Sequence, residues 1–132
     1  MNLKKMHKGS FDLLDSFQIQ IKDPTQEVKS LSGGQRQMVS ISRAVQFEAK
    51  IIIMDEPTAA LGVSETKKVY EFIHKLKEKG ISVIIISHNI NEVFNVADRF
   101  MVMKTGILVG IKRKEETSID DIVTIIISGK VM

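Results

Sequence analysis

Two short apolar runs, Ile51–Met54 and Val83–Ile86, constrain the fold of this chain more than any other feature of its sequence. Both runs are rich in β-branched residues and neither alternates with polar positions, which is typical of strands buried on both faces of a parallel sheet. The segment between them repeats apolar residues at helical spacing, namely Val69, Phe72, Ile73 and Leu76. Strand, helix and strand within about 35 residues predict a βαβ unit with a right-handed crossover.

Caps and periodic apolar positions predict the helices that surround these strands. We expect the helix between the runs to begin at a cap, Ser64, and to end at Gly80. A helix over residues 35–47 follows the loop at Ser32-Gly33-Gly34, and its buried face is formed by Met38, Ile41 and Val45. A later helix is indicated by the spacing of Ile90, Val93, Phe94 and Ala97.

The last third of the chain predicts a hairpin and a final helix. Phe100–Met103 and Ile107–Val109 flank Lys104-Thr105-Gly106, and glycine in such a short connection is typical of a β-hairpin turn. Ser118 then provides a cap for a helix whose apolar side is formed by Ile119, Ile122, Val123 and Ile126. Together these elements indicate an α/β fold with a mostly parallel sheet and flanking helices.

The composition excludes several classes of function. The 132 residues include no cysteine, which rules out disulfides and thiolate metal sites and favours a reducing compartment. A net charge of +3, with no basic segment interleaved with aromatics, argues against nucleic-acid binding. The basic run at 112–114 continues into two glutamates and is interpreted as a solvated turn. Every apolar run is far shorter than the roughly 20 residues that cross a bilayer, so any membrane role must come through a partner.

Polar residues follow both predicted strands at the point where each ends. Asp55 and Glu56 come after the first strand, and His88 comes after the second. Because ligands of open parallel sheets bind beyond the carboxyl ends of the strands, we expect these side chains to share one crevice. Asp55 can hold Mg²⁺ through water, Glu56 can orient or deprotonate a water that attacks phosphorus, and His88 can contact a phosphate. Taken alone, Asp55 and Glu56 are better explained as the start of a solvated loop, and His88 as a surface or capping histidine.

A glycine loop opens one of the predicted helices. Ser32-Gly33-Gly34 lies directly before the helix over 35–47, where unpaired N–H groups and the helix dipole favour phosphate. Glycines let that backbone approach a ligand closely. Taken alone, the loop is better explained as a serine cap with glycine turn residues.

Three segments together resemble a known family. Leu31–Gln37, with the sequence Leu-Ser-Gly-Gly-Gln-Arg-Gln, resembles the signature loop of the ABC transporter ATPases. Ile51–Thr58 resembles their Walker B strand with its catalytic glutamate, and Ile86–Asn89 resembles their switch-histidine loop. The order of the segments and the single helix between neighbouring ones also agree, so the chain is identified as similar to this family. The resemblance implies a partial RecA-like P-loop NTPase core.

The resemblance implies how the signature loop, Leu31–Gln37, would act on ATP. Ser32 and Gly34 would donate to the γ-phosphate, Gly33 would give the loop its shape, and Gln35 would belong to the same nucleotide-binding group. In this family two nucleotide-binding domains pair head to tail, and the loop of one completes the ATP site of the other. Permease subunits would hold the pair on the cytoplasmic face of the membrane, with no direct membrane insertion.

The resemblance also implies roles at the strand ends and a subclass. Asp55 would support Mg²⁺ through water, Glu56 would act as general base or position the water, and His88 would contact the γ-phosphate. The segment Thr58–Val63 is similar to that of importers of monosaccharides such as ribose, xylose or fructose. Gly62 replaces the usual aspartate of the family, so a contact across the subunit interface is expected to be missing.

One part of the family pattern is absent from the sequence. None of the eight glycines begins a Gly-x-x-x-x-Gly-Lys-Ser/Thr motif, the Walker A loop that cradles the phosphates. We therefore expect the C-terminal part of one domain, with residues 1–47 from its helical subdomain and 48–132 from its RecA-like part. The P-loop strand would be missing, which leaves Val83–Ile86 with an unpaired, hydrophobic edge.

Three functional interpretations remain open at this point. The chain is part of a transport ATPase, or it presents its signature loop in trans to a full-length partner without ATP of its own, or it is inert. In each case we expect the isolated chain to bind Mg-ATP weakly or not at all, because nothing holds a phosphate beside Glu56.

Overall fold

The computed structural model describes residues 25–46, 48–59 and 61–129, together with Asp12, Asp15, Ile21 and Asp23. Contacts divide the chain into two compact units, Met1–Ile86 and Ser87–Met132. The predicted boundary between residues 1–47 and residues 48–132 falls inside the first unit. Residues 1–11 of the chain lie outside the described ones. That boundary, which concerns subdomains of a larger domain, stays a prediction. Among the described residues, no helix is both long and apolar enough to cross a membrane.

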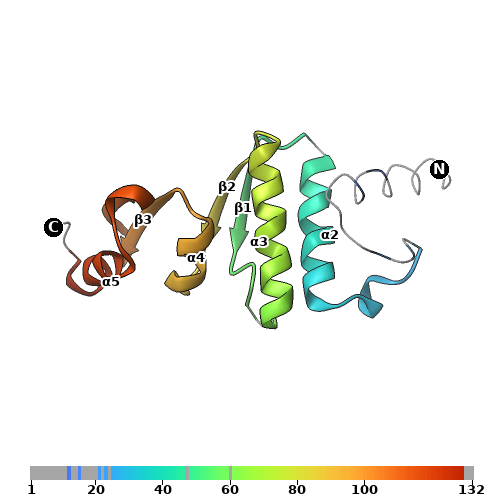
Figure 1. Ribbon diagram of the computed structural model, residues 1–132, viewed down its shortest axis with the longest axis horizontal. Helices are drawn as coiled ribbons and strands as arrows, with labels where there is room; N and C mark the ends of the chain where they lie inside the picture. Colours follow the sequence, from blue (N-terminus) through green and yellow to red (C-terminus); the bar gives the residue numbers. More distant parts are fainter. Residues whose placement is uncertain are drawn as a thin grey trace. The chain divides into compact units, whose positions relative to one another are not determined.

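The first unit contains the predicted βαβ arrangement (Figure 1). β1 (Ile51–Asp55) and β2 (Ser82–Ile86) run parallel, and α3 (Val63–Glu78) connects them. The register of the two strands brings Asp55 opposite Ile86, so that both strands end at the same edge. The sequence prediction of a strand, helix and strand is therefore confirmed.

A second helix, α2 (Gly33–Gln46), lies beside α3 in the same unit and follows a short 3-10 helix, η1 (Val28–Ser30). The helix predicted over 35–47 is thus confirmed, with an earlier start. The two helices and β1 share one core of buried side chains, formed by Met38, Ile41, Ile52, Met54, Val69, Phe72, Ile73 and Leu76. All four predicted positions of α3 belong to this core, and full burial of each contributes roughly 1.5–3 kcal/mol.

The prediction that both strands are buried on two faces is wrong for this structure. In β1 the side chains of Ile52 and Met54 are buried, whereas those of Ile51 and Ile53 are 59% and 66% exposed. The reason is that α2 and α3 cover one face of the two strands, and no described element of this unit covers the other. We call this second surface the open isoleucine face; it is formed by Ile51, Ile53, Ile84 and Ile86.

Within the described part of the chain, the edges of the parallel sheet also have no strand partner. Among the described residues, the sheet consists of β1 and β2 alone, and the other two strands form a separate sheet. The predicted unpaired edge at Val83–Ile86 is therefore confirmed within that part of the chain. Such an edge presents backbone N–H and C=O groups that lack a ladder partner, which favours pairing with another chain.

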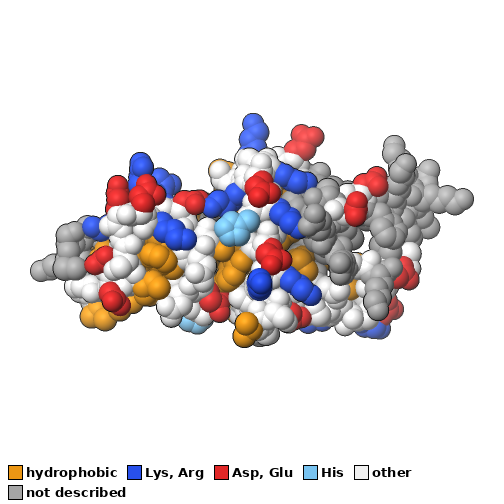
Figure 2. All heavy atoms as spheres, in the orientation of Figure 1, with side chains coloured by type: hydrophobic (Ala, Val, Ile, Leu, Met, Phe, Trp, Pro, Cys, Tyr) orange, Lys and Arg blue, Asp and Glu red, His pale blue; other side chains and the backbone are white. Residues whose placement is uncertain are grey.

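The ends of α3 differ in how well they follow the prediction. The helix begins after Gly62, which has an extended backbone (φ −72°, ψ 163°), and the predicted cap at Ser64 is wrong. Gly80 follows the last turn with φ +77°, a left-handed conformation that favours glycine, and so the predicted end is confirmed. The outer face of α3 carries charged side chains of both signs and a histidine (Figure 2), from Lys67, Lys68, Glu71, His74 and Glu78.

The second unit contains a hairpin between two helices. β3 (Arg99–Lys104) and β4 (Ile107–Arg113) are antiparallel, and Thr105 (φ 48°) and Gly106 (φ 80°) form the two-residue turn. Positive φ at both positions is the signature of a type I′ turn, whose twist matches that of the strands. The predicted hairpin is confirmed. Before it comes α4 (Ile90–Val96), and Phe94 of this helix stacks on Phe100 with 5.1 Å between ring centroids.

The final helix, α5 (Ile119–Ser128), follows a short 3-10 helix, η2 (Lys114–Glu116), and covers the hairpin. Ser118 caps α5 as predicted, because its hydroxyl oxygen accepts a hydrogen bond from the Asp121 backbone N–H. The predicted apolar side is partly wrong: the core contains Ile122 and Ile125, whereas Ile126 is 40% exposed.

The basic run at 112–114 is not the simple turn that the sequence predicts. Lys112 and Arg113 belong to the end of β4, and Lys114 begins η2. The ammonium group of Lys114 lies 5.6 Å from the centre of the Phe94 ring and donates to the Asn95 carbonyl oxygen at 3.2 Å. This residue therefore ties the hairpin to α4 and is only half-exposed.

Candidate functional site

The signature loop begins α2 with a reciprocal cap. The Ser32 hydroxyl oxygen accepts from the Gln35 backbone N–H at 3.3 Å, and the Gln35 side-chain oxygen accepts from the Ser32 N–H at 3.0 Å. This capping box satisfies two of the backbone donors that a helix start would otherwise leave unpaired. The plain interpretation of Ser32 as a helix cap is therefore correct, and any role toward a ligand comes in addition to it.

Gly33 and Gly34 allow a close approach between the start of α2 and the start of α3. A Cβ atom added at Gly33 would lie 2.8 Å from the Leu61 Cδ2 atom, and one added at Gly34 would lie 3.1 Å from the Glu65 Cβ atom. Real Cβ atoms essentially never come as close to a neighbour as 2.8 Å, and a distance of 3.1 Å is tighter than most real Cβ contacts. The sequence suggests that these glycines let the backbone approach a ligand. The structure adds a second reason, because side chains at these positions would press against Leu61 and Glu65.

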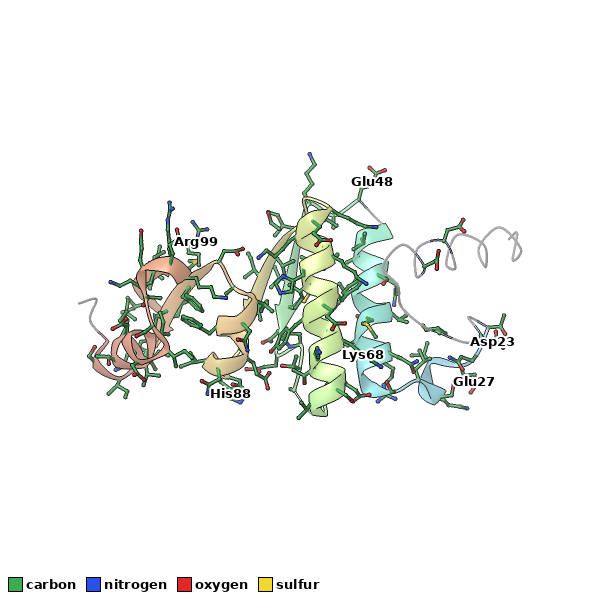
Figure 3. The ribbon with its side chains drawn as sticks, in the orientation of Figure 1. Asp23, Glu27, Glu48, Lys68, His88 and Arg99 are labelled. Carbon is green, nitrogen blue, oxygen red and sulfur yellow. The ribbon has the colours of Figure 1, made fainter. Side chains whose placement is uncertain are left out.

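The Glu65 carboxylate lies at the junction of these two helices, and the sequence gives no expectation for it. A Cβ atom added at Gly33 would lie 3.9 Å from its Oε2 atom, so the carboxylate lies near the first turn of α2. The Gly62 backbone N–H lies 3.5 Å from its Oε2 atom. Hydrogen bonding from Ser32, and then from Gly34 and Gly62, holds the pKa of Glu65 below its ordinary value, with help from the charge of Lys68 one turn along α3 (Figure 3).

A sequence signal for Glu65 does exist. A glutamate three residues after a helix cap is the spacing of a capping box, and Gly62 caps α3. The expected cap at Ser64 hides this spacing, because it moves the start of the helix by two residues. The further contact with Ser32 depends on the packing of α2 against α3, which no local pattern reports.

The first acidic strand end is shaped by a strained residue. Asp55 is the last residue of β1 and is exposed, and Glu56 follows it with φ +44°. Non-glycine residues adopt this left-handed region only when the surrounding structure imposes it, and such positions cluster at functional sites. Here Pro57 and Thr58 are buried directly after the turn, which fixes the backbone on the far side of Glu56.

The histidine lies in the second unit. His88 comes directly before α4 (Figure 3), is exposed, and stands between two residues that build the helix start. The Asn89 backbone N–H donates to the Ser87 hydroxyl oxygen at 3.1 Å, and the Asn89 side chain accepts from the Glu92 N–H at 3.4 Å. Because Asp55 and Glu56 belong to the first unit, the crevice expected to hold them together with His88 stays a prediction.

The fit of the strand end to Mg²⁺ depends on its oxygen donors. Within the described residues, no group of three or more His, Cys, Asp or Glu side chains could hold a metal ion. Mg²⁺ usually keeps several waters and binds through one or two carboxylates plus phosphate oxygens. The exposed Asp55 carboxylate fits the part of a single ligand in such a shell.

Comparison with known proteins gives the family. A sequence model of the ABC transporter family matches residues 6–59, which include the signature loop and the acidic end of β1. The xylose/arabinose import ATP-binding protein of Sulfolobus acidocaldarius is 51% identical over 134 aligned residues, covering 99% of this chain and 53% of that protein. The fructose import ATP-binding protein of Rhizobium meliloti is 41% identical over 110, covering 83% of this chain and 42% of that protein.

Solved structures agree with this similarity. MJ1267, an ATP-binding cassette of an ABC transporter, superimposes with a TM-score of 0.80 at 29% identity, covering 97% of this chain and 51% of that one. The dimeric cassette MJ0796 gives a TM-score of 0.69 at 28% identity, covering 86% and 49%. The chain thus spans about half the length of the cassettes it resembles. It belongs to the ABC transporter ATPase family and has the α/β fold of part of such an ATPase domain.

Proposed function

We propose that the chain acts in an ATP-hydrolysing subunit of an ABC transporter that imports a monosaccharide. The observation that carries this proposal is the 51% identity to a xylose/arabinose import ATP-binding protein along nearly the whole chain. The positions of these residues give further support, because the signature loop opens a helix, Asp55 ends a parallel strand and Glu56 follows it. Helix starts and strand ends are where α/β proteins bind phosphates.

In this proposal the signature loop contacts ATP held by a second subunit. Ser32 and Gly34 donate to the γ-phosphate, and Gly33 and Gln35 shape the loop through packing and capping. The two subunits pair head to tail, and permease subunits hold them at the cytoplasmic face of the membrane. The dimeric state of the MJ0796 cassette supports such a pair as a family arrangement.

The strand ends supply the remaining groups. The exposed Asp55 carboxylate contributes one oxygen to the Mg²⁺ shell, in which phosphate and water oxygens take the other positions. Glu56 orients or deprotonates the attacking water, because its backbone is fixed where the chain leaves β1. His88 contacts the γ-phosphate from the start of α4.

The absence of a Walker A motif favours a second candidate function. In this alternative the chain binds no ATP itself and presents its signature loop in trans to a subunit that has its own Walker A loop. Both versions predict that calorimetry of the chain with Mg-ATP gives no tight binding. Micromolar binding by the isolated chain would contradict both.

The test of the proposal is an ATPase assay in which the chain is added to the full-length Sulfolobus acidocaldarius relative. We expect the rate of phosphate release to rise with the concentration of the chain. Ser32→Arg fills the loop with a long side chain and should abolish the rise. Glu71→Gln, on the exposed face of α3, serves as the control. Equal rates with and without the chain would overturn the proposal.

A further inference from the structure

Arg36, in the first turn of α2, holds the backbone of the signature loop on both sides of Ser32. We propose that Arg36 is a positioning residue of this loop, because it fixes the two peptide groups that flank Ser32 and so sets where the Ser32 hydroxyl lies. The inference deepens the proposed function, and it rests on that function for the phosphate that Ser32 contacts. Arg36 acts through Ser32 and need not touch the phosphate itself.

Arg36 donates to two consecutive carbonyl oxygens. Its guanidinium Nη1 atom lies 2.9 Å from the Leu31 carbonyl oxygen, and its backbone N–H donates to the Ser32 carbonyl oxygen at 2.9 Å. The first carbonyl belongs to the peptide group before Ser32, and the second belongs to the peptide group after it. Because peptide groups are planar, a hydrogen bond to each of them restrains both backbone dihedral angles of Ser32.

The peptide group between Leu31 and Ser32 is held at both of its polar ends. Its carbonyl oxygen accepts from Arg36, and its N–H donates to the side-chain oxygen of Gln35 at 3.0 Å. In a trans peptide the C=O and the N–H point in opposite directions. The side chains of two consecutive residues therefore hold this peptide group from two sides, and it can rotate only when both hydrogen bonds break.

Leu31 anchors this arrangement to the first unit. Its side chain is buried, and its backbone N–H donates to the Val28 carbonyl oxygen at 3.1 Å. Its carbonyl oxygen lies outside the hydrogen-bond ladder of α2, because the Gln35 N–H donates to the Ser32 hydroxyl oxygen instead. The Arg36 guanidinium satisfies this carbonyl, so the loop is tied to a fixed point just before Ser32.

The charge of Arg36 argues against a purely structural role. A cation in the first turn lies at the positive end of the helix dipole, where it is unfavourable and where an acidic side chain would stabilise the helix. The first turn of α2 contains no acidic residue. Arg36 therefore suits a helix start that serves an anion better than it suits one with only a structural role.

The test compares Arg36→Met with Arg43→Met in the isotope-labelled chain. Met keeps an apolar stem, removes the guanidinium donor and leaves the backbone hydrogen bond to Ser32 in place. Arg43 is exposed in the last turn of the same helix, so its variant makes the same charge change away from the loop. In Arg36→Met alone we expect the NMR signal of the Leu31 carbonyl carbon to move upfield. We also expect exchange of the Ser32 amide to accelerate by about tenfold, as for loss of a hydrogen bond from a charged donor.

The second readout is stimulation of the full-length Sulfolobus acidocaldarius relative, measured over a range of chain concentrations. Arg36→Met should lower the maximal stimulated rate by about tenfold, because a misplaced group loses its orientation in the site. The chain concentration that gives half of that maximum should change little. A chain that is merely damaged would behave in the opposite way, since a smaller active fraction raises this concentration and leaves the maximum unchanged. Arg43→Met should match the wild type in both quantities.

An unmoved Leu31 signal in Arg36→Met would overturn the inference, and so would a maximal stimulated rate equal to that of the wild type. If the wild-type chain itself gives no stimulation, the proposed function fails. A moved Leu31 signal together with faster Ser32 exchange in Arg36→Met would still support Arg36 as the residue that fixes the loop, because the NMR measurements contain no partner subunit.

Discussion

The backbone N–H of Glu56 donates to the carbonyl oxygen of Ile86 at 2.8 Å, which extends the β1–β2 ladder one residue beyond the last strand pair. This bond fixes the main chain of Glu56 at the point where the chain leaves β1.

Glu56→Gln should not reduce stimulation of a full-length partner. The reason is that the proposed stimulation acts through the signature loop, while Glu56 would serve only an ATP bound to its own subunit. Ser32→Arg is the matched variant that should remove stimulation. The measurement is the rate of phosphate release, with urea unfolding as the control for stability. Loss of stimulation in Glu56→Gln would assign this residue a role across the interface.

Gly62 and Gly80 are predicted to respond in opposite directions to the same substitution. Both have open space around an added Cβ, but Gly62 has an ordinary φ and Gly80 has φ +77°. Gly62→Ser supplies a side-chain cap to α3 and should raise the free energy of unfolding by about 0.5–1 kcal/mol. Gly80→Ser should lower it by about 1 kcal/mol. Urea unfolding measures both, and equal effects would contradict the assigned backbone conformations.

The hairpin turn offers a stabilising substitution. Thr105 is β-branched and has φ 48°, a conformation that such residues rarely adopt, whereas asparagine tolerates it. Thr105→Asn creates the Asn-Gly pair preferred in type I′ turns and should stabilise the second unit by up to about 1 kcal/mol. Gly106→Ala, at φ 80°, should destabilise it by a similar amount. Thermal unfolding followed by circular dichroism distinguishes the two, and a lower midpoint for Thr105→Asn would refute the turn.

Stability should fall as the solution becomes acidic. Hydrogen bonds from Ser118 lower the pKa of Asp121, and those from Ser32 lower the pKa of Glu65. A carboxyl with a lowered pKa in the folded state contributes stability above its unfolded value, and loses it as pH drops below about 4. The unfolding midpoint measured from pH 6 to pH 3 should therefore decline. The decline should be shallower in Asp121→Asn, and an identical slope would argue against this linkage.

Much of the fold could be predicted from local sequence. The buried face of α3, including Phe72 and Leu76, follows from helical spacing, because a helix with one apolar side encodes its own buried positions. The Thr105-Gly106 turn is equally local. The end at Gly80 follows from the conformational freedom of glycine.

The predictions that were wrong concern features that depend on tertiary packing. Apolar runs such as Ile51–Met54 indicate strands, but whether both faces are buried depends on what else packs there, which the runs cannot report. The close packing of Glu65 against Gly34 arises from the approach of α2 to α3, and this approach is a tertiary feature. For the same reason, the expected meeting of Asp55, Glu56 and His88 remains a prediction that the motifs alone make.

The open isoleucine face has a practical consequence for handling the protein. Water beside four large aliphatic side chains is released when they are covered, so the gain for covering them grows with temperature near ambient conditions. Warming and sulfate salts should therefore precipitate the chain more readily than its net charge would suggest. Purification is best done cold and in salts of low salting-out strength.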